Sequence, residues 1–182
     1  MRRIPTFLIL TLAMSTSLLT PAAWAQDQTI EVAALRCSAI SLVHSPLTVP
    51  TPQFGELMTQ FAGLFAQVHM LHKSERTKAK VNPHDFVAQR EAVIAEMNKG
   101  WPGVKNDRIR EAALCNVWRT ALFTKIPEKP SEKDFQNALL NIGMPPTNAS
   151  KEEIANWEKL TPQAFAVWAQ MKVNQKDQKN KK

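Results

Sequence analysis

Apolar side chains recur every three or four residues along most of this chain, and this spacing predicts helices. The clearest example runs from Phe54 to His72, where the apolar residues fall on one helical face for about five turns. Tyr is absent, only five Gly occur, and Val and Ile are spread out rather than gathered in alternating runs. We therefore expect an all-α protein, a single-domain bundle of about five to seven helices.

Helix-capping residues divide the chain into segments. The recurring signals are Ser, Thr or Asn followed by Pro, and Ser followed three residues later by Asp or Glu. Pro162 interrupts the last apolar stripe, so that segment is read either as two helices or as one kinked helix. Together with the apolar stripes, these signals predict helices at about 29–44, 51–72, 82–99, 106–124, 131–142 and 150–171.

The first 25 residues have the pattern of a secretory signal peptide. Arg2 and Arg3 precede an apolar run at 7–19, and Ala23-Trp24-Ala25 is an A-x-A cleavage site. The run is shorter than the roughly 20 apolar residues that a membrane-spanning helix needs, and no later segment comes closer. We expect residues 1–25 to be removed, no transmembrane segment, and a periplasmic or secreted protein.

Cys37 and Cys115 are the only cysteines, and two thiols in an exported protein usually form one disulfide. Each lies on the apolar stripe of a predicted helix, so both are expected to face the core. A bridge across 78 residues would contribute about 4.5 kcal/mol by restricting the unfolded chain. The alternative is two buried free cysteines that act as small apolar residues. We predict the disulfide.

The formal net charge of +7 is concentrated at the ends of the chain. Residues 172–182 carry five Lys and one Asp, and without them and the two N-terminal Arg the remainder is only +1. A nucleic-acid-binding fold spreads Lys and Arg over a face, so we expect no nucleic-acid partner. We predict a helical domain at 26–173 and a disordered basic tail at 174–182, capable of weak contact with an anionic surface.

His69 and His72 are the only candidate pair of metal ligands with helical spacing. A zinc site needs three or four protein ligands, and a third would have to come from His44, His84 or Glu75. The chain has no HExxH, CxxC or G-x-S-x-G motif. We therefore predict no catalytic residues, no metal site and no cofactor, with His69 and His72 kept as weak metal candidates.

Trp101 is the tryptophan most expected to be exposed, because it lies in the turn Gly100-Trp-Pro-Gly103. An exposed aromatic side chain at a turn is a candidate binding contact. The alternative is that Trp101 packs onto the next helix.

These features favour a non-enzymatic, exported helical protein that binds another macromolecule, expected to be a protein, in the cell envelope. Its role would be that of an accessory, inhibitor or immunity-type factor. One alternative is a binder of a small apolar or metal ligand within the helical bundle. A second is an enzyme acting on envelope glycan, because two catalytic carboxylates need only meet in space.

Overall fold

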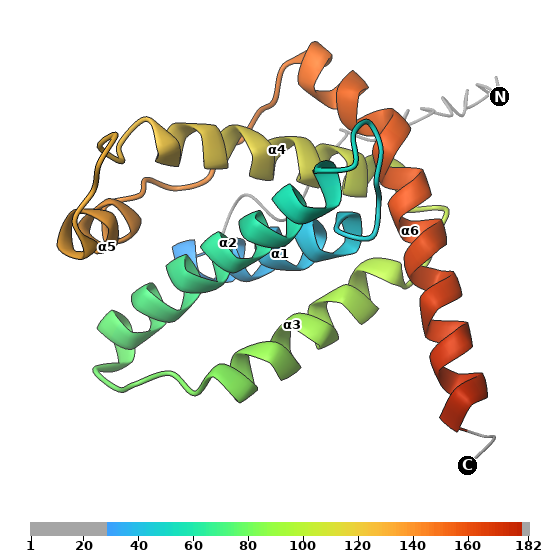
Figure 1. Ribbon diagram of the computed structural model, residues 1–182, viewed down its shortest axis with the longest axis horizontal. Helices are drawn as coiled ribbons and strands as arrows, with labels where there is room; N and C mark the ends of the chain where they lie inside the picture. Colours follow the sequence, from blue (N-terminus) through green and yellow to red (C-terminus); the bar gives the residue numbers. More distant parts are fainter. Residues whose placement is uncertain (1–28, 180–182) are drawn as a thin grey trace, which may run out of the picture.

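The computed structural model describes residues 29–179, which form a bundle of six helices (Figure 1). This part of the chain contains no strand. The expected signal peptide, and residues 180–182 of the tail, lie outside it. The all-α fold class and the number of helices are confirmed. The helices are α1 Ile30–His44, α2 Phe54–Thr77, α3 Pro83–Asn98, α4 Lys105–Phe123, α5 Glu132–Leu140 and α6 Lys151–Lys179.

Helix α1 is the centre of the bundle and packs against α2, α3, α4 and α6. Figure 1 shows α1 alongside α2, with α3 and α4 to either side of this pair. Its buried face is rich in small residues, including Ala33, Ala34 and Ala39, each at most 1% exposed. Small side chains allow neighbouring helices to approach closely. Thr29 caps α1 as predicted, because its hydroxyl oxygen accepts a hydrogen bond from the Val32 backbone N–H.

Helix α2 begins later than the sequence indicates. Gln53, not Thr51, is its N-cap, and no side chain caps the helix. Gly55, in the first turn of α2, lies very close to the loop that follows α1. A Cβ atom there would lie 2.3 Å from the Ser45 carbonyl oxygen and 2.6 Å from that of Leu47, so the loop after α1 presses directly on the α2 backbone.

The remaining caps follow the sequence more closely. Asn82 accepts a hydrogen bond from the His84 N–H at the start of α3, and Pro83 occupies the first turn. Ser131 and Asp134 form the complete capping box of α5. At the start of α6, the Ser150 hydroxyl accepts from the N–H of Glu153. For α4, the N-cap is Val104, and no side chain caps that helix.

Helix α6 settles the ambiguity at Pro162, because the chain forms one helix with the proline inside it. The helix also continues to Lys179, which differs from the expected disorder of residues 174–182. Residues 174–178 are exposed. This end of α6 is therefore helical rather than irregular, although the exposed side chains of residues 174–178 are not part of the hydrophobic core.

The core joins side chains from all six helices. Phe65 of α2 stacks on Trp118 of α4 with ring centroids 5.3 Å apart, and both are at most 2% exposed. Phe165 of α6 is also fully buried.

No helix within residues 29–179 combines the length and the apolar character needed to cross a membrane.

Candidate functional site

The predicted disulfide is present and links α1 to α4. Cys37 and Cys115 have Cα atoms 5.4 Å apart and are 1% and 3% exposed. Both apolar stripes therefore face the core, as their helical spacing indicates. The bridge fixes the position of α4 on α1, and the polar cluster described next lies beside it.

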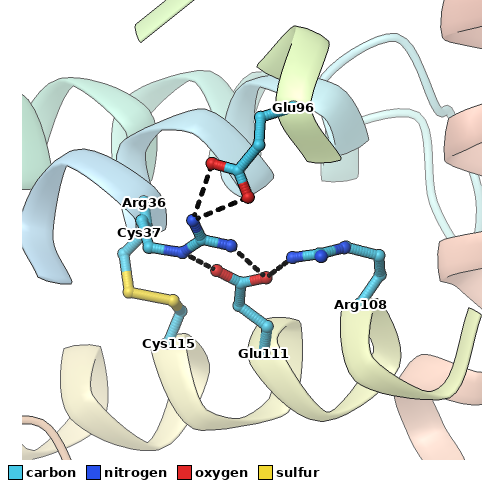
Figure 2. Close-up of polar contacts among 6 residues, drawn as sticks. All are labelled: Arg36, Cys37, Glu96, Arg108, Glu111 and Cys115. Atoms are coloured by element: carbon cyan, nitrogen blue, oxygen red, sulfur yellow. Dashed lines mark hydrogen bonds and ion pairs between the residues drawn. A yellow bond between two sulfur atoms is a disulfide. The ribbon is translucent and has the colours of Figure 1, made fainter. Parts of the chain in front are cut away.

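Four charged side chains meet next to the disulfide (Figure 2). Arg36 of α1 donates through Nε to Glu111 Oε1 at 2.6 Å and through Nη2 to Glu111 Oε2 at 3.3 Å. Its Nη1 contacts Glu96 of α3 at 3.2 Å, and Arg108 donates to Glu111 at 2.5 Å. We call Arg36, Glu96, Arg108 and Glu111 the Arg36 cluster. It ties three helices together.

Three members of the Arg36 cluster are mostly buried, and the Glu96 side chain, 58% exposed, lies at its edge. The Glu111 side chain is only 2% exposed and those of Arg36 and Arg108 are 13% and 12% exposed. Burial by itself lowers the pKa of Arg36, but the carboxylates of Glu111 and Glu96 more than offset this and the pKa is raised. Arg36 binds both carboxylates, so the cluster is suited to holding helices rather than to acid–base chemistry.

Sequence reasoning missed the Arg36 cluster, although a signal was present. Arg36 directly precedes Cys37, and Glu111 lies one turn before Cys115, on the same face of α4. Opposite charges beside two cysteines that form a bridge are brought together by that bridge. Glu96 and Arg108 give no comparable signal, because only the packing of α3 against α1 places Glu96 there.

The weak metal candidates bind separate backbone carbonyls. His69 Nδ1 donates to the Glu31 carbonyl oxygen at 2.7 Å, and His72 Nε2 donates to that of Leu139 at 3.1 Å. Each imidazole thus ties α2 to a different neighbour, α1 or α5. Between residues 29 and 179, no three His, Cys, Asp or Glu side chains are grouped as metal ligands would be. The structure therefore gives no support to a shared metal site.

His44, considered as a third ligand, is instead a buried polar link between α1 and α6. Its Nδ1–H donates to the Ile40 carbonyl oxygen at 2.7 Å, and Nε2 accepts from the Thr161 hydroxyl at 3.0 Å. The ring also packs edge-on against Trp157 at 4.9 Å. Burial lowers the pKa of His44 to about 4, so the imidazole is neutral at neutral pH.

Trp101 packs onto the bundle instead of standing free at its turn. Its ring stacks on Phe165 of α6, with centroids 4.6 Å apart and planes 15° from parallel. The side chain is only partly exposed and contacts the main core. The alternative weighed for Trp101 was packing onto the next helix, α4, and the helix on which its ring stacks is α6.

A different aromatic and arginine group lies on the surface between α2 and α4. The guanidinium of Arg119 covers the Phe61 ring at 4.1 Å and lies 5.7 Å from the Phe123 ring. Phe123 is 46% exposed, and Leu57, one turn before Phe61, is 42% exposed. We call Leu57, Phe61, Arg119 and Phe123 the Arg119 patch. Sequence reasoning missed it, because α2 and α4 are far apart in the chain.

Polar neighbours hold Arg119 in place. Its Nε and Nη2 both donate to Asn116 Oδ1, at 3.1 and 2.8 Å. Asn116 in turn donates to Glu153 of α6, whose same oxygen accepts from the Trp157 indole N–H at 3.1 Å. Burial lowers the pKa of Arg119 and the charge of Glu153 opposes that shift, yet an arginine remains protonated at neutral pH. The patch therefore presents a fixed positive charge.

A very small cavity lies next to Arg119, whereas a larger groove elsewhere on the bundle is open to solvent. The cavity, lined by Arg119, His44, Trp157 and side chains of α1, α2 and α4, has a volume of about 10 Å³, enough for about one water molecule. A groove of about 290 Å³ between α2 and α5 has Met70, Leu71 and Val81 among its lining residues. It is open to solvent.

Lys172 and Lys176, near the end of α6, are exposed. The Lys172 Nζ lies 3.2 Å from Glu91 of α3 and 5.0 Å from the centre of the Trp168 ring. Lys172 precedes the expected tail at 174–182, so this ion pair uses none of the charges expected to meet an anionic surface.

Comparison with known proteins gives no further guide to function. No protein-family model matches the chain, and neither the curated proteins nor the solved structures provide a significant match.

Proposed function

We propose that this chain is an exported, non-enzymatic protein that binds another protein of the cell envelope, as an accessory, inhibitor or immunity-type factor. The signal-like residues 1–25 support export. A disulfide that closes a large part of a small helical domain suits an oxidising compartment. Binding as the activity is supported by one surface, the Arg119 patch.

The Arg119 patch has the composition of a protein-binding surface. Arginine and aromatic residues are enriched at the centres of interfaces, where they supply contact area and directed hydrogen bonds. Here Phe61 and Asn116 already hold the arginine, so binding a partner would cost little side-chain entropy. Phe123 and Leu57 add exposed apolar area beside the charge.

The two alternative functions receive less support from the described residues. The cavity within the bundle, of about 10 Å³, is far smaller than the roughly 300 Å³ typical of a ligand pocket. The groove of about 290 Å³ between α2 and α5 reaches that size, but it is open to solvent and would bury little of a small apolar ligand. For an enzyme acting on glycan, Glu96 and Glu111 are two carboxylates that share Arg36 as an ion-pair partner. These ion pairs account for the position of both carboxylates through the packing of α1, α3 and α4, without a catalytic role.

Site-specific photo-cross-linking in intact cells tests the proposal. A benzophenone amino acid would replace Phe123 in the patch or, as a control of similar exposure, Val32 on α1, since their exposures are 46% and 41%. We expect a discrete adduct with one partner protein from position 123 and none from position 32. Position 87, beside Phe86 and Arg90, gives a second comparison, because an arginine also covers an aromatic ring there. The proposal is wrong if position 123 gives no adduct, or if positions 123 and 32 give the same one.

A further inference from the structure

We propose that Arg119 is the anchor for a carboxylate on the partner, and hence that the partner presents an acidic side chain flanked by apolar residues. This inference rests on the proposed binding function and gives it a chemical identity. Its basis is that Arg119, unlike Arg36 and Arg108, has no carboxylate partner among the described residues. Arg90 of α3, which lies over the Phe86 ring at 5.4 Å, shares this property, but its guanidinium lies farther from its ring than that of Arg119 does at 4.1 Å.

Arg119 has unused hydrogen-bond capacity. Arg36 and Arg108 each bind Glu111, with closest contacts of 2.6 and 2.5 Å, whereas no carboxylate within residues 29–179 lies within 4.0 Å of the Arg119 guanidinium. Glu153, the nearby acid, accepts from Asn116 and Trp157 instead. Among the described residues, Arg119 Nη1 donates to none, so two of its five N–H groups are available.

The position of Arg119 favours a strong contact with an anion. Its guanidinium lies over the Phe61 ring, 4.1 Å from the centroid, and is half-buried, where less water competes for its donors. A carboxylate that takes up the free donors would form charge-assisted bonds, about twice as strong as neutral ones. The planar group of Asp or Glu also matches the guanidinium fork.

The surroundings favour a protein carboxylate over a lipid surface. Attraction to an anionic membrane is about 1 kcal/mol per basic residue and needs several of them together. The Arg119 patch has one cation, which covers the buried Phe61 ring, and its exposed apolar side chains are those of Leu57 and Phe123. A single charge bordered by apolar area fits an acidic residue set among apolar residues on another protein.

The inference can be tested without knowing the partner. The probe is the acetylated, amidated hexapeptide Leu-Glu-Leu-Glu-Leu-Glu, with its Leu-Gln counterpart as the neutral match. Each is titrated into the isotope-labelled chain beginning at Gln26 while the Arg119 Nε–H and Trp157 indole NMR signals are followed. We expect both signals to shift with the Glu peptide, and the Gln peptide to bind roughly tenfold more weakly.

Two variants of α4 separate a specific site from general attraction. Arg119→Gln should abolish the shift of the Trp157 signal, whereas Arg110→Gln, which removes an exposed arginine from the same helix, should leave it unchanged. Arg119→Lys keeps the charge and loses the planar fork, so binding should be intermediate. Thermal unfolding of each variant identifies any that fails to fold, and the two peptides still test the unmodified chain.

Three results would overturn the inference. They are equal binding of the Glu and Gln peptides, equal loss of binding in both glutamine variants, and stronger Arg119-dependent binding to phosphatidylglycerol vesicles than to the Glu peptide. Cross-linking from Phe123 that persists in Arg119→Gln would also contradict it while the proposed function stands. Loss of all cross-linking with retained peptide binding would contradict the proposed function instead.

Discussion

Acidification should weaken the fold through His44, the buried histidine that joins α1 to α6. Its two ring nitrogens are used by the Ile40 carbonyl and the Thr161 hydroxyl, and the residue is fully buried. The Nε2 position must stay unprotonated to accept from Thr161. A proton on Nε2 would place an unpaired charge in the core, and this is why burial lowers the pKa of His44 to about 4.

The size of the effect follows from the difference in pKa between the folded and unfolded chain. The usual histidine pKa is 6.5, so below that value the unfolded chain binds more protons and the free energy of unfolding decreases. The decrease develops from about pH 6.5 and is complete below the folded-state value of about 4. At about 1.36 kcal/mol per pKa unit, the total is about 3.4 kcal/mol, of which about 2 kcal/mol is lost by pH 5.

Urea unfolding followed by tryptophan fluorescence at pH 7.5, 6 and 5 measures this loss. His44→Gln should be less stable at pH 7.5, yet should lose about 2 kcal/mol less than the unmodified protein between pH 7.5 and 5. His84→Gln is the matched control, because His84 is exposed at the start of α3. If the unmodified protein and His44→Gln show the same pH dependence, the assignment to His44 is wrong.

Three further outcomes are expected. Replacing both cysteines by Ser should lower the free energy of unfolding by up to about 4.5 kcal/mol, seen as a large drop in Tm, and an unchanged Tm would contradict the stabilising role of the bridge. Glu111→Gln should cost about 3–5 kcal/mol in urea unfolding because it removes a buried partner of two arginines, whereas Glu96→Gln, at a 58% exposed side chain, should cost less than about 1 kcal/mol; equal losses would refute the role of burial. Deleting residues 174–182 should leave Tm within error, because the described side chains there are exposed, and a clear decrease would show that this segment stabilises the bundle.

Local signals predicted the helices well where a cap and a stripe agreed. Thr29 caps α1, and Ser131 caps α5 as part of a full capping box. At Thr51 the same type of signal was misleading, because α2 begins at Phe54 with Gln53 as its N-cap and no side chain caps it. Pro162 left two alternatives open, and a helix that continues through the proline is the one found.

The candidate binding residues could not be predicted in the same way. Trp101 was singled out by its turn, yet Phe165 covers one face of its ring, and that contact depends on how α6 crosses the bundle. Arg119 gave no signal in the sequence. Its position over the Phe61 ring, with no carboxylate partner among the described residues, depends on how α2 and α4 pack and on where every neighbouring acid is placed.

The sequence by itself determined the helical class of this protein, most helix ends and the pairing of Cys37 with Cys115. The helical class follows from side-chain periodicity, and the helix ends follow from capping side chains that bind backbone groups within three residues. The pairing follows because the chain has only two thiols. Only the tertiary structure decided which buried polar and charged groups are partners. His44 meets Thr161 across 117 residues, and Arg36 meets Glu111 across 75. Such partners are chosen by how helices cross, and the crossing depends on the packing of the whole core.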